Sequence, residues 1–554
     1  MGFCPLHIRQ GGGGQVLLPQ VSFYVYTMRG HRPQTCQPVK VRVKSTYGHI
    51  FRKQTEDPMD ILYHSTRGDA SEITASQAVL NGLAPDGGLY VPAQIPLLET
   101  APEAMTAMSY QEVAYEVMHR FLTDYTEEEL KQCIAGAYDS KFDTPEIAPL
   151  KKAGSAYYLE LFHGATIAFK DMALSILPHL MTTAARKNGV TDKIVILTAT
   201  SGDTGKAAMA GFADVPGTEI IVFYPKDGVS PVQERQMVTQ KGENTHVVAI
   251  RGNFDDAQTG VKKLFGDAAL AEQLSAAGMR FSSANSINIG RLVPQIAYYV
   301  YAYVRLLADG KIQAGEVINV VVPTGNFGNI LAAYYAKQMG MPFGKLICAS
   351  NQNNVLSDFF KGGTYDKNRP FYTSSSPSMD ILVSSNLERL LYRICGDDTG
   401  TVAEWMRQLT SDGVYSVPAQ MQEGLADFYG NYAGEDAVSE RIHALYQETG
   451  YVLDPHTAVA SAVYEMYRKE TGDDKPAVIA STASPFKFAR SVLHAIDAER
   501  YDAMTDLEQF DALADVAGLK TPAAIEEIKT APVRHDMVVD IPEMRDAVCS
   551  ILKL

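Results

Sequence analysis

The sequence predicts an α/β fold in which parallel strands alternate with crossover helices. The chain has 554 residues and is 46% hydrophobic, which is enough for more than one lobe, because domains usually hold about 100–200 residues. From Met59 onward, short apolar runs rich in β-branched residues alternate with segments of helical pattern. Such alternation is typical of parallel sheets, whose ligands bind at the carboxyl ends of the strands. The strands expected from these runs are residues 193–200, 220–224, 245–250, 317–323 and 477–482.

Three segments of helical pattern support this interpretation. Residues 205–213 and 330–339 follow two of the expected strands directly, as crossover helices do. Residues 292–308 form the longest apolar stretch, which Gln295 and Arg305 interrupt. We therefore expect residues 292–308 to be a buried helix and not a membrane span.

The first 58 residues differ in composition from the rest of the chain. They hold eight Lys/Arg and two acidic residues, a local charge of 8 − 2 = +6, while the remainder carries 41 − 62 = −21. They also contain four consecutive glycines at 11–14 and lack the apolar stretch and cleavage site of a secretory signal. We interpret residues 1–58 as a disordered extension translated from upstream of the true start. A transit segment is the alternative, because the stretch is basic.

Charge and cysteine spacing exclude several classes of function. The net charge of −15 argues against a nucleic-acid partner, because such binding depends on Lys and Arg facing phosphates. No two of the six cysteines lie within thirty positions of each other, so no zinc-binding pair exists. The sequence also lacks an HExxH motif and an EF-hand loop. We expect no metal, and reduced thiols in a cytoplasmic protein.

The loop after the first expected strand reads ATSGDTGKAA and is similar to the phosphate loop of an ATPase. That loop requires a glycine where Thr200 stands and a hydroxyl residue where Ala207 follows Lys206. The sequence fails both requirements. Ser201, Thr204 and the backbone N–H groups of the helix start would instead suit either a carboxylate or a phosphate.

A second loop, TGNFGN at residues 324–329, has the features of a phosphate site without a lysine. Gly325 and Gly328 allow close approach of the backbone, and the following helix start offers free N–H groups to an anion. The amides of Asn326 and Asn329 can add donors. The alternative is an ordinary strand-to-helix turn.

Lys170 is the candidate nucleophile. It lies in the first turn of an expected amphipathic helix, beside an apolar stripe. Burial there would lower its pKa from about 10.4 and favour the neutral amine that attacks a carbonyl. A surface lysine with a buried stem is the alternative. The stripe consists of Phe169, Met172, Ala173, Ile176 and Leu180.

One cofactor accounts for these three features. Pyridoxal phosphate needs an amine for its aldehyde and hydrogen-bond donors for its phosphate, and its amino-acid substrates bring a carboxylate. The combination therefore predicts a pyridoxal-phosphate enzyme.

Eight motifs, taken in order, resemble the threonine synthase family in its bacterial and fungal branch. The similarity extends from Met59 to the C-terminus. It implies the tryptophan-synthase-β-like fold (fold type II), with two α/β lobes at 151–554, an N-terminal domain at 59–150 and the extension at 1–58. The motifs are STRG (65–68), GLAPDGGLY (82–90), HGATIAFKD (163–171), ATSGDTG (199–205), NSINIGR (285–291), PTGNFGN (323–329), LDPHTAVA (453–460) and STASPFKF (481–488).

The resemblance also implies an activity. Members of the family convert O-phospho-L-homoserine and water to L-threonine and phosphate by a β,γ-replacement, the last step of threonine biosynthesis. The implied protein is a cytoplasmic lyase, monomeric or homodimeric, with a small-molecule substrate and no nucleic-acid or membrane partner. Two alternatives stay open: another enzyme of the fold, such as a serine/threonine dehydratase or a cystathionine-type synthase, and a non-catalytic relative that only binds pyridoxal phosphate.

Site residues follow from the resemblance by position. Lys170 would bind the cofactor aldehyde and act as the catalytic base, and Thr482 would hydrogen-bond the pyridine nitrogen. The residues implied for the cofactor phosphate are Gly325, Asn326, Phe327, Gly328 and Asn329. Those implied for the substrate carboxylate are Ser201, Gly202, Asp203 and Thr204. Three candidates remain for the cation that meets the substrate phosphate: Arg67, Arg291 and Lys487.

Some positions depart from the family pattern or carry weaker signals. Ala165 stands where the family often has proline, Ile289 where it has an aromatic residue, and 484–487 where it has His-Pro-Ala-Lys. Asp454 before a proline suits a helix N-cap. We therefore expect His456, two residues later, to be structural.

Overall fold

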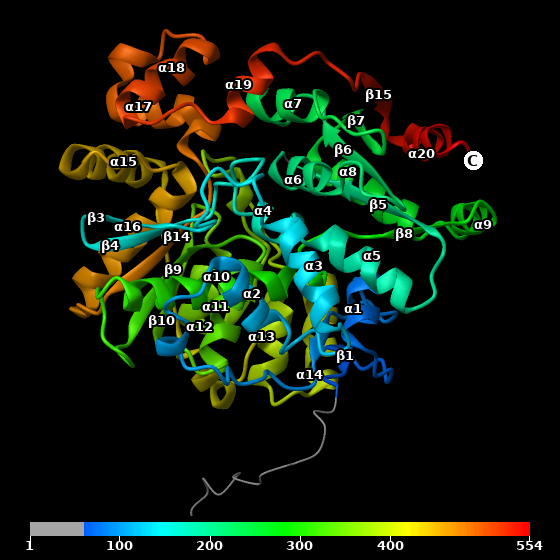
Figure 1. Ribbon diagram of the computed structural model, residues 1–554, viewed down its shortest axis with the longest axis horizontal. Helices are drawn as coiled ribbons and strands as arrows, with labels where there is room; N and C mark the ends of the chain where they lie inside the picture. Colours follow the sequence, from blue (N-terminus) through cyan, green and yellow to red (C-terminus); the bar gives the residue numbers. More distant parts are fainter. Residues whose placement is uncertain (1–59, 201) are drawn as a thin grey trace, which may run out of the picture. The chain divides into compact units, whose positions relative to one another are not determined.

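The computed structural model describes residues 60–200 and 202–554. The expected extension at 1–58 and Ser201 lie outside the described residues. Residues Asp60–Leu554 form one compact unit. In Figure 1 its two larger sheets lie on opposite sides of helix α4, Asp171–Leu174.

The first large sheet has six strands in the order β13-β10-β9-β14-β4-β3. All neighbours are parallel except the β3–β4 hairpin. The strands β9 and β14 in its centre are entirely buried, as expected for a sheet covered on both faces. The strands are β3 Leu150–Ala153, β4 Ala156–Glu160, β9 Ile318–Pro323, β10 Phe343–Ser350, β13 Phe428–Tyr432 and β14 Ala477–Ser481.

The second large sheet has five parallel strands in the order β15-β7-β6-β5-β8. The C-terminal part of the chain reaches this sheet from the other lobe, because β15 pairs with β7 after helices α17 and α18 (Figure 1). Its strands are β5 Lys193–Ala199, β6 Thr218–Pro225, β7 Thr245–Arg251, β8 Met279–Ser282 and β15 Met537–Asp540. Two short antiparallel pairs complete the strands: β1 Tyr63–Ser65 with β2 Tyr90–Pro92, and β11 Thr364–Asp366 with β12 Val414–Ser416.

Helix α10, Ile289–Ala308, packs at the centre of the unit against α2, α4 and α11. Most of its side chains are buried, including the polar Arg291, Gln295, Tyr298 and Tyr299. In the part of the chain that the structure describes, no helix has the length and apolar character needed to cross a bilayer.

The other helices cover the faces of the sheets, and many begin at capping boxes or end at left-handed glycines. Ser109 with Glu112 caps α2, and Gly472 ends α16. The helices are α1 Ala75–Asn81, α2 Tyr110–Met118, α3 Glu127–Ala137, α5 Leu177–Lys187, α6 Asp203–Phe212, α7 Pro231–Val238, α8 Phe254–Phe265, α9 Ala268–Ala276, α11 Gly328–Gln338, α12 Val355–Gly362, α13 Leu387–Ile394, α14 Thr399–Ser411, α15 Glu435–Thr449, α16 Pro455–Thr471, α17 Ala489–Tyr501, α18 Asp506–Ala517, α19 Ala523–Thr530 and α20 Met544–Leu552. Short 3-10 turns lie at Pro102–Met105, Pro377–Met379, Ala419–Leu425, Pro485–Phe488 and Ile541–Glu543.

The expected strands and the buried helix at 292–308 are confirmed, each within a few residues of the predicted ends. One detail differs: the single helix expected after Lys170 is two helices, α4 and α5. Pro178 has no N–H to donate to the carbonyl of Leu174, so the helical ladder breaks there. Gly211 of α6 packs directly against the Leu174 carbonyl at this break. Only glycine fits there, because a β-carbon would lie 2.1 Å from the Leu174 oxygen.

Candidate active site

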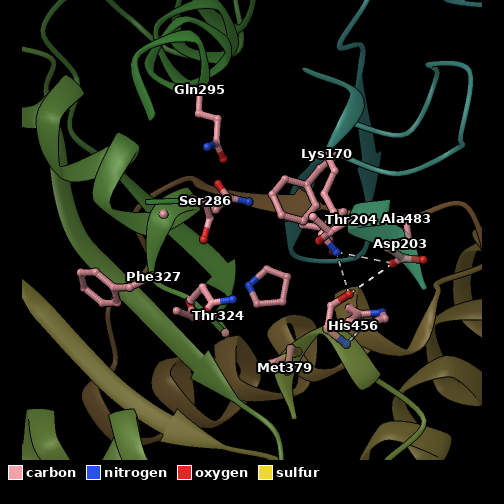
Figure 2. Close-up of a pocket in the computed structure, with 18 of the residues that line it drawn as sticks. Lys170, Asp203, Thr204, Ser286, Gln295, Thr324, Phe327, Met379, His456 and Ala483 are labelled. Carbon is pink, nitrogen blue, oxygen red and sulfur yellow. Dashed lines mark hydrogen bonds and ion pairs between the residues drawn. The ribbon is translucent and has the colours of Figure 1, made fainter. Parts of the chain in front are cut away.

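One pocket lies at the carboxyl ends of strands β5, β9 and β14 (Figure 2). It brings together Lys170, Thr482, the loop at 323–329 and the first residues of α6, Asp203 and Thr204. The pocket therefore unites the three features that the sequence singles out. Gly202 is buried at the N-cap of α6 but does not line the pocket.

Lys170 is the N-cap residue of α4, and its side chain points into the pocket. Its Nζ donates to Ser378 Oγ at 2.9 Å and lies 3.7 Å from Asp203 Oδ2. Burial lowers the pKa of Lys170 to about 8; Asp203 opposes this change, whereas Lys487 and Arg291 add to it. A substantial fraction of the amine is therefore neutral near physiological pH.

Asp203 at the start of α6 carries a buried negative charge. Its Oδ1 lies 3.1 Å from Lys487 Nζ and accepts from Gln233 Nε2 at 2.9 Å. Burial would raise the pKa of Asp203, but the charges of Lys487 and Lys170 outweigh burial and hold the pKa well below its usual range. An ionised carboxylate repels anions, so any contact of this residue with a substrate carboxylate falls to its backbone N–H.

The backbone of the α6 loop is held by Thr200, which the ATPase motif would replace with glycine. Its Oγ1 accepts from the N–H groups of Gly202 at 3.0 Å and Gly205 at 2.9 Å. A β-carbon at Gly205 would lie 2.5 Å from the Thr200 methyl group. The threonine and the glycine therefore depend on each other, and the loop is built differently from an ATPase loop.

The loop after β9 is shaped for an anion. Phe327 adopts a left-handed conformation with φ 64°, which is uncommon for a non-glycine residue. Its ring is buried against Phe360 and Phe428, with centroids 5.9 and 5.8 Å away. Gly325 is required, because a β-carbon there would lie 2.4 Å from the Ser378 carbonyl oxygen. The loop leads directly into the N-terminus of α11, where unpaired N–H groups favour anions.

The position of this loop is fixed by Asn386 and Arg389. The carbonyl of Asn326 accepts from the Asn386 backbone N–H at 3.1 Å and from Asn386 Nδ2 at 3.0 Å. Arg389 is fully buried and donates to Asn386 Oδ1 and to the carbonyls of Tyr90 and Ile287. This buried cation therefore ties the N-terminal segment, the loop before α10 and the anion loop together.

Two buried donors on the pocket wall have no hydrogen-bond partner among residues 60–200 and 202–554. They are Asn329 Nδ2 and Arg291 Nε. An unsatisfied buried donor costs about 1–3 kcal/mol, more when charged. Both residues line the pocket, and an anion is the kind of group that supplies the missing acceptors.

The three candidate cations for the substrate phosphate differ in their partners and in whether they line the pocket. Arg67 is committed to Glu388 through two hydrogen bonds of 2.9 and 2.8 Å and does not line the pocket. Lys487 is buried against Asp203 and the carbonyl of Thr166. Arg291 lines the pocket; burial lowers its pKa to about 10, so it stays charged at neutral pH. Its Nε has no hydrogen-bond partner among the described residues.

Ser378 and His456 complete the wall around Lys170. Ser378 Oγ donates to Asp203 Oδ2 at 3.2 Å, and its backbone N–H donates to His456 Nε2 at 3.2 Å. His456 Nδ1 lies 3.0 Å from Asp454 Oδ1, and Asp454 caps α16 as expected. Ser378 is a site residue that the sequence does not predict, because it lies in the short 3-10 turn Pro377–Met379 and no motif marks it.

Comparisons with known proteins show the family of this chain. Family models match at residues 62–138 (threonine synthase N terminus), 145–483 (pyridoxal-phosphate dependent enzyme) and 457–531 (threonine synthase, C-terminal). The second of these alone covers more than half of the chain. The chain belongs to the threonine synthase family.

Individual relatives show how far the similarity extends. Threonine synthase of Schizosaccharomyces pombe is 37% identical over 79% of this chain and 90% of its own length, and that of Pseudomonas aeruginosa is 39% identical over 78% and 89%. Threonine synthase-like 1 of Homo sapiens is 40% identical over 76% of this chain, but the match spans only 58% of that relative.

Solved structures of the family share the fold. The chain matches pyridoxal-phosphate-bound threonine synthase from Brucella melitensis with a TM-score of 0.76, 34% identity and coverage of 89% of this chain and all of that one. It matches yeast threonine synthase with a TM-score of 0.79, 31% identity and coverage of 89% and 99%. The expected fold type II architecture is confirmed.

The pocket fits the family cofactor, pyridoxal phosphate. The buried amine of Lys170 suits an aldehyde, and the orphaned Asn329 amide beside a helix start suits a phosphate. The departures from the family pattern leave this fit intact, because Ala165, Ile289 and the residues at 484–487 do not line the pocket.

We expect the attachment of pyridoxal phosphate to cofactor-free protein to depend on pH through Lys170. The neutral amine is the attacking form, so the rate should rise about tenfold per pH unit below pH 8 and level off above a pKa of about 8. Stopped-flow absorbance measures the rate. Nα-acetyl-lysine amide, measured in parallel, corrects for titration of the cofactor itself. A rate that climbs to about pH 10, as for an exposed lysine, would contradict the assignment.

Proposed function

We propose that this protein is a threonine synthase, a pyridoxal-phosphate-dependent lyase that converts O-phospho-L-homoserine and water to L-threonine and phosphate in the last step of threonine biosynthesis. The carrying observation is one pocket that combines a partly neutral buried lysine, an anion loop without a lysine and a separate buried arginine, Arg291. The substrate brings a carboxylate and a phosphate in addition to the cofactor phosphate, so a site with several anion positions suits it.

Specific residues would hold the cofactor. Lys170 would bind its aldehyde, the N–H groups at 325–329 and the Asn329 amide would bind its phosphate, and Thr482 would face its ring nitrogen. When bound, pyridoxal phosphate supplies the electron sink that makes a Cα proton removable. Thr482 is neutral and would not enforce a charged ring nitrogen, so surrounding dipoles would share the stabilisation.

Proton transfer is assigned to Lys170 Nζ. A base whose pKa is about 8 is well matched to physiological pH. Ser378 Oγ, which contacts both Lys170 Nζ and Asp203, orients the amine. The negative charge of Asp203 stabilises the ammonium that forms when Nζ takes up a proton, because it lies 3.7 Å away.

The substrate anions would occupy two further positions. The carboxylate would bind at the start of α6, in the loop of Ser201, Gly202, Asp203 and Thr204. Ser201, Thr204 and the N–H of Asp203 would supply the donors, because the N–H of Gly202 already donates to Thr200 Oγ1. The substrate phosphate would meet Arg291, because this residue lines the pocket and its Nε has no hydrogen-bond partner among residues 60–200 and 202–554.

We further propose residues 59–150 as an N-terminal domain, residues 151–554 as the catalytic region, and a cytoplasmic protein that is monomeric or homodimeric. The free thiols of Cys133, Cys348, Cys395 and Cys549 fit a reducing compartment.

The products of the reaction distinguish this function from its rivals. We expect purified protein to release phosphate from O-phospho-L-homoserine and form L-threonine, without comparable ammonia release from L-threonine. Lys170→Ala should lower phosphate release to background, because it removes the base. Colorimetric phosphate and ammonia assays measure both. Dominant ammonia release would indicate a dehydratase, and a protein that binds the cofactor without releasing either product would indicate a non-catalytic relative.

Arg291→Met should impair use of the phosphorylated substrate. Loss of a buried charge contact typically costs about 2–4 kcal/mol, which is roughly a 30- to 1000-fold decrease in kcat/KM. The absorbance of the bound cofactor should persist. Arg305→Met, on the same helix but in a partly exposed ion pair with Asp309, is the matched control and should stay within about twofold. Equal kinetics in the two variants would remove Arg291 from the substrate site.

A further inference from the structure

The amide of Asn329 has an unusual set of partners on helix α10. Its Oδ1 accepts hydrogen bonds from the hydroxyls of Tyr298, at 2.7 Å, and Tyr299. Tyr298 also lies 3.1 Å from the oxygen of Gln295. Asn329 is the second residue of α11 and lines the pocket.

The two tyrosines can act only as donors at this oxygen. Both are buried, and burial raises the pKa of each well above its ordinary value, so both keep their protons. Two hydroxyl donors satisfy this oxygen and hold it toward α10. If the amide turned over, its NH₂ group would donate to the hydroxyl oxygens, which also accept, but the amide oxygen would lose both donors and take the place of the NH₂ group.

This orientation leaves the amide nitrogen unpaired. Asn329 is only 7% exposed, and Nδ2 has no partner within the described part of the chain. The neighbouring Phe327 holds a left-handed conformation that brings the start of α11 to the same wall. Buried donors normally have a hydrogen-bond acceptor, and a helix N-terminus favours an anion as that acceptor.

We propose that Tyr298 and Tyr299 are positioning residues that lock Asn329 with its donor toward the phosphate of the cofactor, and so determine the preference of the pocket for phosphorylated over unphosphorylated pyridoxal. The proposal deepens the proposed function and rests on it. The tyrosines do not line the pocket. They hold the amide oxygen of Asn329 on the side of α10. An amide oxygen facing the pocket would repel a phosphate.

A purely structural role predicts a different outcome. Tyrosines that only fill the core would weaken both forms of the cofactor equally when altered, because Lys170 and the pocket walls would shift together. A role in orienting the amide affects only the form that carries the phosphate. Comparing the two ligands therefore separates the two roles.

The experiment titrates full-length, cofactor-free protein with pyridoxal 5′-phosphate and with pyridoxal, following absorbance. We compare wild type, Tyr298→Phe, Tyr299→Phe and the double variant. The double variant should lose at least tenfold of the wild-type preference for the phosphorylated form, while its Kd for pyridoxal changes less than about threefold. Each single variant should show part of the loss, which keeps the test valid if the double variant does not fold.

Two further variants sharpen the test. Tyr335→Phe is the matched control, because Tyr335 is a fully buried tyrosine of α11 whose hydroxyl has no partner among the described residues. It should leave the preference unchanged. Asn329→Ala should lose the preference, and adding Tyr298→Phe and Tyr299→Phe to it should cause no further loss, because the tyrosines act through the amide.

Three outcomes would overturn the inference: an unchanged preference in the double variant, equal losses for both ligands, or additive losses on the Asn329→Ala background. Failure of the proposed function has a different signature. Wild-type protein that prefers pyridoxal 5′-phosphate but releases no phosphate from O-phospho-L-homoserine would refute that function and leave the role of the tyrosines intact.

Discussion

The site depends on how one buried carboxylate is shared between two lysines. Asp203 lies 3.1 Å from Lys487 and 3.7 Å from Lys170, so its closer partner is the lysine that does not line the pocket. Lys487 neutralises Asp203 well enough to keep it ionised in the interior. Lys170 is left with a weaker counter-charge and a repelling neighbour, and burial brings its pKa to about 8. Without Lys487, Asp203 would pair with Lys170 directly and hold it in the charged form.

The rest of the structure places Asp203 and Lys170 beside the anion loop at 323–329. Strands β5, β9 and β14 end at the same pocket, and two of them lead into helices whose N-termini face it. The pieces are joined by buried polar contacts as well as by apolar packing. Arg389 is the clearest case, because it links three segments through carbonyl and amide oxygens. Within the described part of the chain, no carboxylate forms a hydrogen bond with it. Such a buried charge is tolerated only when its donors are used. The anion loop is therefore held by the N-terminal segment as well as by its own strand.

Much of the fold and of the site could be predicted from the sequence. The exceptions depend on contacts or backbone effects that the local pattern does not reveal. The strands, the buried α10 and the gathering of Lys170 with residues 325–329 follow from local patterns and from the rule that parallel sheets bind ligands at one edge. Ser378 could not be predicted because it meets Lys170 across 208 positions, from a short 3-10 turn that carries no motif. The sequence predicts only that Tyr298 and Tyr299 belong to a buried helix. Their hydrogen bonds to Asn329 become visible only in the folded structure. The break between α4 and α5 reflects Pro178, whose effect the apolar stripe obscured.

We propose that the amine of Lys170 holds the cofactor aldehyde, and the other roles in the site depend on this assignment. Reduction of the cofactor-loaded protein with borohydride, followed by digestion and peptide mapping, tests it directly. We expect one modified peptide, which carries Lys170. Lys206 is the informative rival, because burial also lowers its pKa to about 8 although it does not line the pocket. Modification of Lys206 or any other lysine, or no modification at all, would contradict the account.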